Sequence, residues 1–102
     1  MTAPGDNLEF QGSSVFKARV IDIPGFEERV AKRLKNTPDA GTPVCSGINE
    51  LELEVLGIIY VVFVARHRNR ISLMYVYQLS EPDLIEKRRK QLIRLYGKGG
   101  VR

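Results

Sequence analysis

The chain has 102 residues, of which 43% are hydrophobic and 27% charged, a length and composition typical of one globular domain. This composition excludes a disordered, collagen-like or disulfide-scaffold chain. The longest apolar stretch, Val55 to Ala65 with Gly57 included, has 11 residues, about half of what a membrane-spanning helix needs. One cysteine, Cys45, and one histidine, His67, exclude an intramolecular disulfide and a Cys/His zinc site. We therefore expect no metal and no cofactor.

The net charge of +4 is concentrated near the end of the chain. Nine basic and nine acidic side chains balance over residues 1–79, whereas residues 80–102 carry seven basic and three acidic ones. A basic segment indicates nucleic acid or an acidic partner. The alternative is a solvated basic helix face.

The first 14 residues lack periodicity, and Asn7 to Ser14 resembles a protease-site remnant left by recombinant expression. We therefore expect residues 1–14 to be a disordered or expression-derived tail. A single domain is expected over residues 15–97, followed by a C-terminal tail over 98–102. The start has no basic and apolar signal segment, which with the single cysteine favours a cytoplasmic location.

The first half of the domain is expected to contain a strand, a helix and a loop. Phe16, Ala18 and Val20 alternate with basic residues, which predicts a strand over Val15 to Ile23. Apolar residues then recur four apart from Phe26 to Leu34, which predicts a helix over residues 26–36. Two prolines and two glycines predict a loop over Thr37 to Gly47.

The second half is expected to contain three strands and a helix. Strict alternation predicts a strand over Asn49 to Leu56, with glutamates on one side. Ile58 to Ala65 is apolar on both sides, which predicts a central strand covered on both faces. Ile71 to Leu79 follows a polar hairpin tip and is expected to place Leu73, Tyr75 and Tyr77 on one face.

The last helix is expected to begin with Ser80 as its N-cap, in a capping-box-like pattern with Asp83, and to end at Gly97. Its apolar stripe is expected to contain Leu84, Ile85, Leu92, Leu95 and Tyr96, with Arg88 inside it. The order is β-α-β-β-β-α, which predicts an α+β fold with helices packed on an antiparallel sheet.

Two basic groups are candidate nucleic-acid-binding sites. The hairpin-tip group is expected to bring Arg66 and Arg70 close together across the turn. The members of the two groups are Arg66, Arg68 and Arg70 at the tip, and Lys87, Arg88, Arg89, Lys90 and Arg94 in the last helix.

Catalytic groups are not evident. His67 is a weak candidate for a general acid or base. Glu50, Glu52 and Glu54 form a carboxylate stripe that is either a solvated face or a site for a metal, a basic partner or acid–base chemistry. Cys45 has no histidine near it in the sequence, so a nucleophile is not expected there.

The order of the expected elements and several short sequence segments resemble the RelE/HigB/ParE superfamily of toxins from type II toxin–antitoxin systems. Ile48 to Leu53 is similar to the family's LYELRV segment, and Ile58 to Phe63 is similar to IYRVLY. Asn69 to Met74 is similar to NRIVLL, and a helix with an RKQL end follows. The resemblance covers residues 15–96. It implies a RelE-like fold and a protein that acts on ribosome-bound mRNA.

Three positions depart from the basic residues that the family uses on its concave sheet face. Glu52, Val61 and Leu79 stand where the resemblance implies arginine, arginine and lysine. The resemblance therefore favours weak or lost endoribonuclease activity, with Tyr96 beside His67 as a remaining candidate. An antitoxin protein, and the ribosome with its bound mRNA, are the implied partners. The alternative is a non-catalytic module of the same fold that binds an antitoxin-like protein or forms a homodimer.

Overall fold

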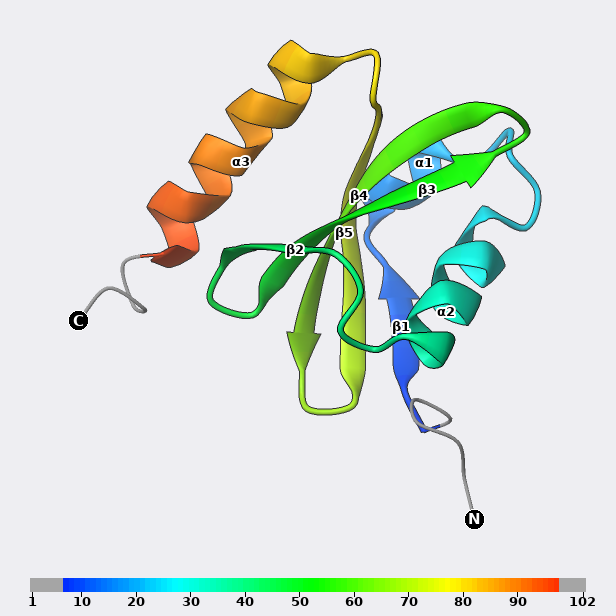
Figure 1. Cartoon of the computed structure of the whole chain (residues 1–102), viewed down its shortest axis with the longest axis horizontal. Helices are drawn as coiled ribbons and strands as arrows, with labels where there is room; N and C mark the ends of the chain where they lie inside the picture. The colour runs from blue at the N-terminus through cyan, green and yellow to red at the C-terminus, as the bar shows by residue number, and fades with distance from the viewer. Residues whose placement is uncertain (1–6, 98–102) are drawn as a thin grey trace.

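The computed structural model describes residues 7–97, which form an α+β fold with a five-stranded mixed sheet (Figure 1). The strands lie in the order β1-β5-β4-β3-β2, and β1 runs parallel to β5 while the other pairs are antiparallel. Within these residues, no helix is long and apolar enough to cross a membrane. The elements are β1 (Glu9–Gly12), α1 (Ser14–Arg19), α2 (Phe26–Asn36), β2 (Thr42–Cys45), β3 (Ile48–Val55), β4 (Ile58–His67), β5 (Arg70–Gln78) and α3 (Pro82–Tyr96).

One face of the sheet, called face A, packs against α1 and α2. Its largest buried side chains include Leu51, Val62 and Leu73, which join Phe16 of α1 and Phe26 of α2 in one core. The helix over residues 26–36 is confirmed. Its apolar residues four apart are all buried, as an amphipathic helix requires.

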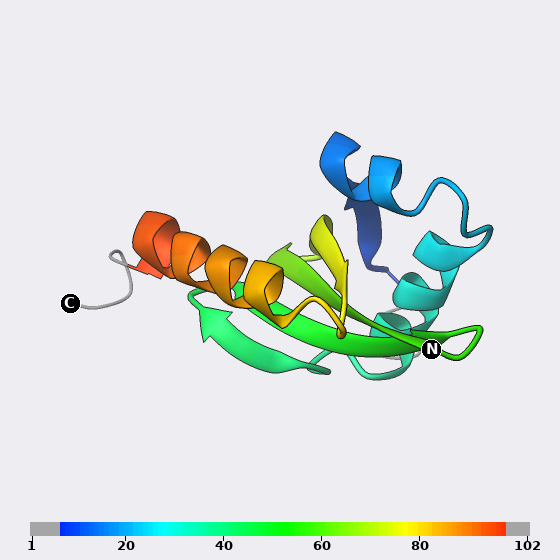
Figure 2. The ribbon, with the colours of Figure 1, turned by 90° about the horizontal axis from the view of Figure 1, so that it is seen from above.

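The opposite face, called face B, packs against α3. Val61 and Phe63 of β4 form a second buried cluster with Ile85 and Leu92 of α3. In Figure 2, α3 therefore lies apart from α1 and α2. The prediction of a central strand buried on both faces is confirmed, since Val61 to Val64 are buried on alternating sides.

The start of the domain differs from the sequence prediction. Residues 9–12, assigned to a tail, form β1 and pair with β5, and Leu8 is buried in the core. Val15 to Ile23 is not a strand: α1 begins at Ser14, and the Ser13 hydroxyl accepts a hydrogen bond from the Phe16 N–H at 3.0 Å. Phe16 and Val20 fit helical spacing as well as alternation. Residues 1–6 and the predicted tail over 98–102 lie outside the described residues.

The expected loop over residues 37–47 contains the edge strand β2, in which Pro43 is tolerated because an edge strand has one unpaired side. The turn before it requires Gly41, whose φ is 103° and whose added Cβ would lie 2.7 Å from the Glu50 carbonyl oxygen. The order is therefore β-α-α-β-β-β-β-α rather than β-α-β-β-β-α.

A bulge in β5 overturns the predicted alternation of that strand. Phe63 pairs with Tyr75 but Val64 pairs with Leu73, so Met74 is an extra residue. The bulge places Leu73 on face A and Tyr75 and Tyr77 on face B. The aromatic side chains therefore face α3 instead of sharing a side with Leu73.

The ends of α3 only partly follow the prediction. Its N-cap is Glu81 without a side-chain cap, and the Ser80 hydroxyl bonds to Gln78 instead. Gly97 is the C-cap, as predicted. Of the expected apolar stripe, Ile85 and Leu92 are buried, whereas Leu84, Leu95 and Tyr96 are exposed.

Candidate nucleic-acid interface

A basic groove runs between α3 and the β5 part of face B. It has a volume of about 380 Å³ and is lined by Tyr77, Leu84, Lys87, Arg88, Gln91 and Arg94. The helical residues among them lie three to four apart, which puts them on one side of α3. This side points over β5, while the side with Ile85 and Leu92 packs on the sheet.

Arg88 connects α3 to the two tyrosines of β5. Its guanidinium carbon lies 3.7 Å from the centre of the Tyr75 ring, and its Nε donates a hydrogen bond to the Tyr77 hydroxyl at 2.9 Å. Gln91 accepts a further hydrogen bond from Arg88. Arg88 is therefore held against the two tyrosines of the sheet rather than extending into solvent.

A second hollow of about 320 Å³ lies where β5 meets β1, and Tyr75 and Met74 line it together with Ser13 and Ser72. The stacked pair of Arg88 and Tyr75 belongs partly to each hollow.

Arg89 has a structural role. Its Nε and one terminal nitrogen donate to the two carboxylate oxygens of Glu50 at 2.7 and 2.9 Å, and it also pairs with Glu86. The hydrogen bonds that Arg89 donates to Glu50 raise the pKa of Arg89 further above its ordinary value. This bidentate pair fixes α3 to β3.

The predicted basic group of α3 is thus divided. Lys87, Arg88 and Arg94 line the groove, Arg89 is bound to Glu50, and Lys90 is exposed outside it. Helical periodicity could have made this division from the sequence, but the tyrosines opposite depend on the bulge at Met74.

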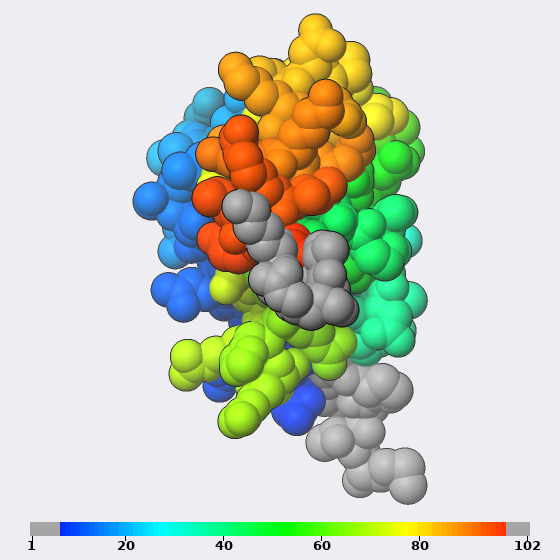
Figure 3. Space-filling model, turned by 90° about the vertical axis from the view of Figure 1, so that its left-hand side faces the viewer, coloured from blue at the N-terminus to red at the C-terminus, as the bar shows by residue number. Residues whose placement is uncertain are grey.

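The hairpin-tip group is divided as well, so the expected closeness of Arg66 and Arg70 is wrong. His67 pairs with Arg70 across the strands, while Arg66 pairs with Ile71 and lies on face A. Arg66 donates to the Arg68 carbonyl oxygen at 3.1 Å, and Arg70 lies 3.4 Å from a Glu9 oxygen. Figure 3 shows this hairpin below α3 on the same side of the molecule.

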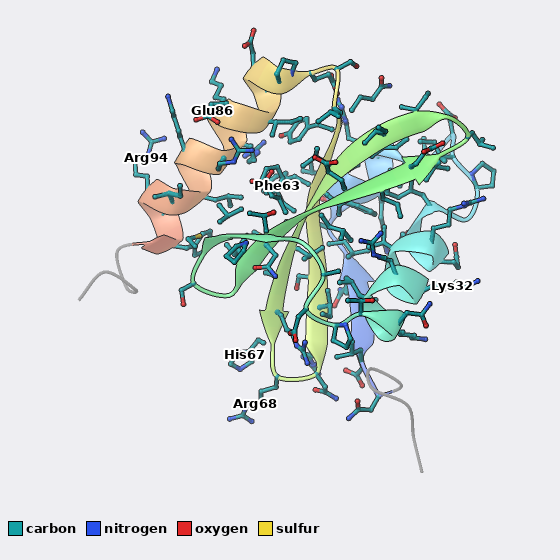
Figure 4. All side chains as sticks on the ribbon, in the orientation of Figure 1. Lys32, Phe63, His67, Arg68, Glu86 and Arg94 are labelled. Atoms are coloured by element: carbon teal, nitrogen blue, oxygen red, sulfur yellow. The ribbon has the colours of Figure 1, made fainter. Side chains whose placement is uncertain are left out.

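The two weak catalytic candidates do not line the groove. His67 lies at the hairpin tip beside Arg68, away from Arg94 on α3 (Figure 4). Tyr96 is half exposed in the last turn of α3. Among residues 7–97, no three histidine, cysteine or acidic side chains gather closely enough to hold a metal.

The three positions that depart from the family pattern lie at one end of face B. Glu52 pairs with Val61, which pairs with Tyr77, and the Leu79 N–H donates to the Ile59 carbonyl oxygen at 2.8 Å. Val61 is only 2% exposed because α3 covers it. These three positions therefore supply no basic group to the described sheet. A basic group from outside the sheet is nevertheless present at this end, because the Arg19 guanidinium of α1 lies 5.2 Å from the centre of the Tyr77 ring and pairs with Glu81.

Comparisons of the chain with protein-family models, curated proteins and solved structures found no match.

Proposed function

We propose that the chain is a RelE-like protein that binds single-stranded mRNA in the groove between α3 and β5, with weak or no cleavage activity. The observation that carries the proposal is the convergence of Lys87, Arg88 and Arg94 with Tyr77 on one groove. The sequence resemblance to RelE/HigB/ParE toxins supplies the ribosome-bound message as the expected target.

The groove chemistry suits a single strand. Lys87 and Arg94 are exposed and can neutralise phosphates. The Arg88 guanidinium, already stacked on Tyr75, presents its outer plane to a base, and RNA bases stack on such planes. A groove of about 380 Å³ fits a short splayed segment better than a duplex, which is read across wide surfaces.

Weak cleavage follows from the groups that line the groove. RNA cleavage requires a base near the attacking hydroxyl and preorganised stabilisation of the charged transition state. No carboxylate or histidine is among the lining residues, and the Tyr77 hydroxyl is already bonded to Arg88. The lining groups left to stabilise charge are basic side chains, of which Arg88 is the one held against the tyrosines of the sheet.

RNA affinity tests the binding part. Anisotropy of a fluorescein-labelled single-stranded RNA should show a lower affinity for K87A/R94A than for the intact chain. Each lost phosphate contact should reduce the slope of log K against log salt by about 0.7. The control is K32A/R33A on the exposed side of α2, where Lys32 projects away from α3 (Figure 4). Equal losses in both variants would mean that binding follows net charge only.

Cleavage of mRNA on translating ribosomes tests the catalytic part. We expect little product from the intact chain, and robust cleavage would contradict the assignment of a weak site.

The alternative is a non-catalytic RelE-fold module that binds an antitoxin-like protein or a second copy of itself. It is favoured by the acidic and apolar residues at the uncovered end of face B, Glu52 and Leu79 among them. Growth arrest on expression that the neighbouring open reading frame relieves would contradict this non-catalytic alternative.

A further inference from the structure

Face B extends beyond α3 at the end where β3 turns into β4. Side chains of face B form rows across the strands, and the two rows next to α3 are Glu50 with Phe63 and Tyr75, then Glu52 with Val61 and Tyr77. The next row contains Glu54, Ile59 and Leu79, by the pairing of Glu54 with Ile59 and the backbone bond from Leu79 to Ile59. Ile59 is 39% and Leu79 43% exposed. This outer row is therefore an apolar strip with an acidic border.

The turn beside this row is strained and apolar. Leu56 has a φ of 53° and is 84% exposed, and Gly57 follows it with a φ of 83°. Two-residue turns of this kind favour asparagine or glycine at the first position, because a bulky side chain is strained there. Leu56 is therefore both strained by its backbone and exposed, a combination that turn geometry does not favour.

The acidic border has no partner within the described residues. Glu52 and Glu54 are exposed and form no ion pair there, whereas Glu50 in the same column binds Arg89. The α3 helix shows one way in which a helix can bind this column of glutamates. Its Arg89 pairs with Glu50, while Ile85 and Leu92 on either side of it pack on face B.

We propose that the outer row and the Leu56 turn bind a basic amphipathic helix of a partner protein, which lies beside α3. Its apolar residues would cover Ile59, Leu79 and Leu56, and its lysines or arginines would pair with Glu52 and Glu54. RNA does not fit this surface, since the carboxylates repel phosphates. The interface is separate from the groove, because Lys87 and Arg94 take no part in it.

A peptide of residues 82–96 is a suitable probe, since it carries the spacing of Ile85, Arg89 and Leu92. The fluorescein-labelled peptide would be titrated with the full chain and followed by anisotropy. E52K/E54K should weaken binding by about tenfold or more, since two attractions become repulsions. The charge-matched control D22K/E28K, with both changes on exposed residues outside face B, should bind as the intact chain does.

The turn provides an independent readout. L56N should raise the melting temperature because it relieves the left-handed strain, and it should weaken peptide binding because it removes the apolar contact. A purely structural leucine would leave peptide affinity unchanged, and that result would overturn its assignment to the interface.

Two other outcomes would overturn the proposal. Equal binding to E52K/E54K and to the control would mean that the peptide replaces α3 or binds elsewhere. Dimerisation of the intact chain that E52K/E54K abolishes in sedimentation experiments would assign the surface to a second copy. RNA affinity should be unaffected by L56N, so failure of this proposal is distinguishable from failure of the groove.

Discussion

Removal of the Arg89 guanidinium should destabilise the fold through the carboxylate that it leaves behind. Glu50 has only 17% of its side chain exposed, and both of its oxygens accept bonds from Arg89. An unpaired buried polar group costs about 1–3 kcal/mol. Because Arg89 is 34% exposed, water can replace part of the interaction. We therefore expect R89A to lower the free energy of unfolding by about 1–2 kcal/mol.

The assay is thermal and urea unfolding followed by circular dichroism. For a domain of this size, such a loss corresponds to a decrease in Tm of about 5–15 °C. The exposed R94A is the matched control and should change stability by less than about 0.5 kcal/mol.

A double-mutant cycle separates the charge effect from lost packing. E50Q removes the carboxylate charge that R89A leaves without a partner. The loss of unfolding free energy in R89A/E50Q should therefore be smaller than the sum of the losses in the two single variants, by about 1 kcal/mol. Additive effects, or an R89A protein as stable as the intact chain, would refute the structural role assigned to this pair.

Two further predictions concern the buried Val61 and the half-buried Cys45. V61R should cost on the order of 3–5 kcal/mol, because it buries a charge beneath α3, whereas E52R/L79K at exposed positions should melt close to the intact chain. Burial raises the pKa of the Cys45 thiol, so its alkylation by iodoacetamide should be slower than that of a free cysteine at pH 8 and should reach half its maximum rate at a higher pH. V61R melting like E52R/L79K, or a Cys45 profile identical to that of free cysteine, would contradict the burial of these residues.

Strong local periodicity made α2, β3 and β4 predictable from the sequence. Each has an apolar pattern that burial repeats, at Phe26, Val30 and Leu34 in α2, at Leu51 and Val55 in β3, and over residues 60–64 in β4. The start was not predictable in the same way, because Phe16 and Val20 satisfy both a strand and a helix pattern. Asn7 to Ser14 has no periodic pattern and resembles a protease-site remnant, so the sequence gives no sign of β1 or of the Ser13 cap.

The groove was only half predictable. The basic character of α3 is evident in the sequence, and helical spacing separates Arg88 from Arg89. The side of the groove that the sheet forms depends on Met74, because this single extra residue in β5 turns Tyr75 and Tyr77 toward α3. No local signal marks such a bulge, since it arises from the pairing of two strands.

Crosslinking tests the central claim most directly, because it locates the RNA on the surface. Single-stranded RNA containing 4-thiouridine would be irradiated with the intact chain and the modified peptides identified by mass spectrometry. We predict crosslinks in residues 71–78 of β5 and 82–96 of α3, and their loss in K87A/R94A. Crosslinks confined to α2 or to the β4–β5 hairpin tip would contradict an RNA site between α3 and β5.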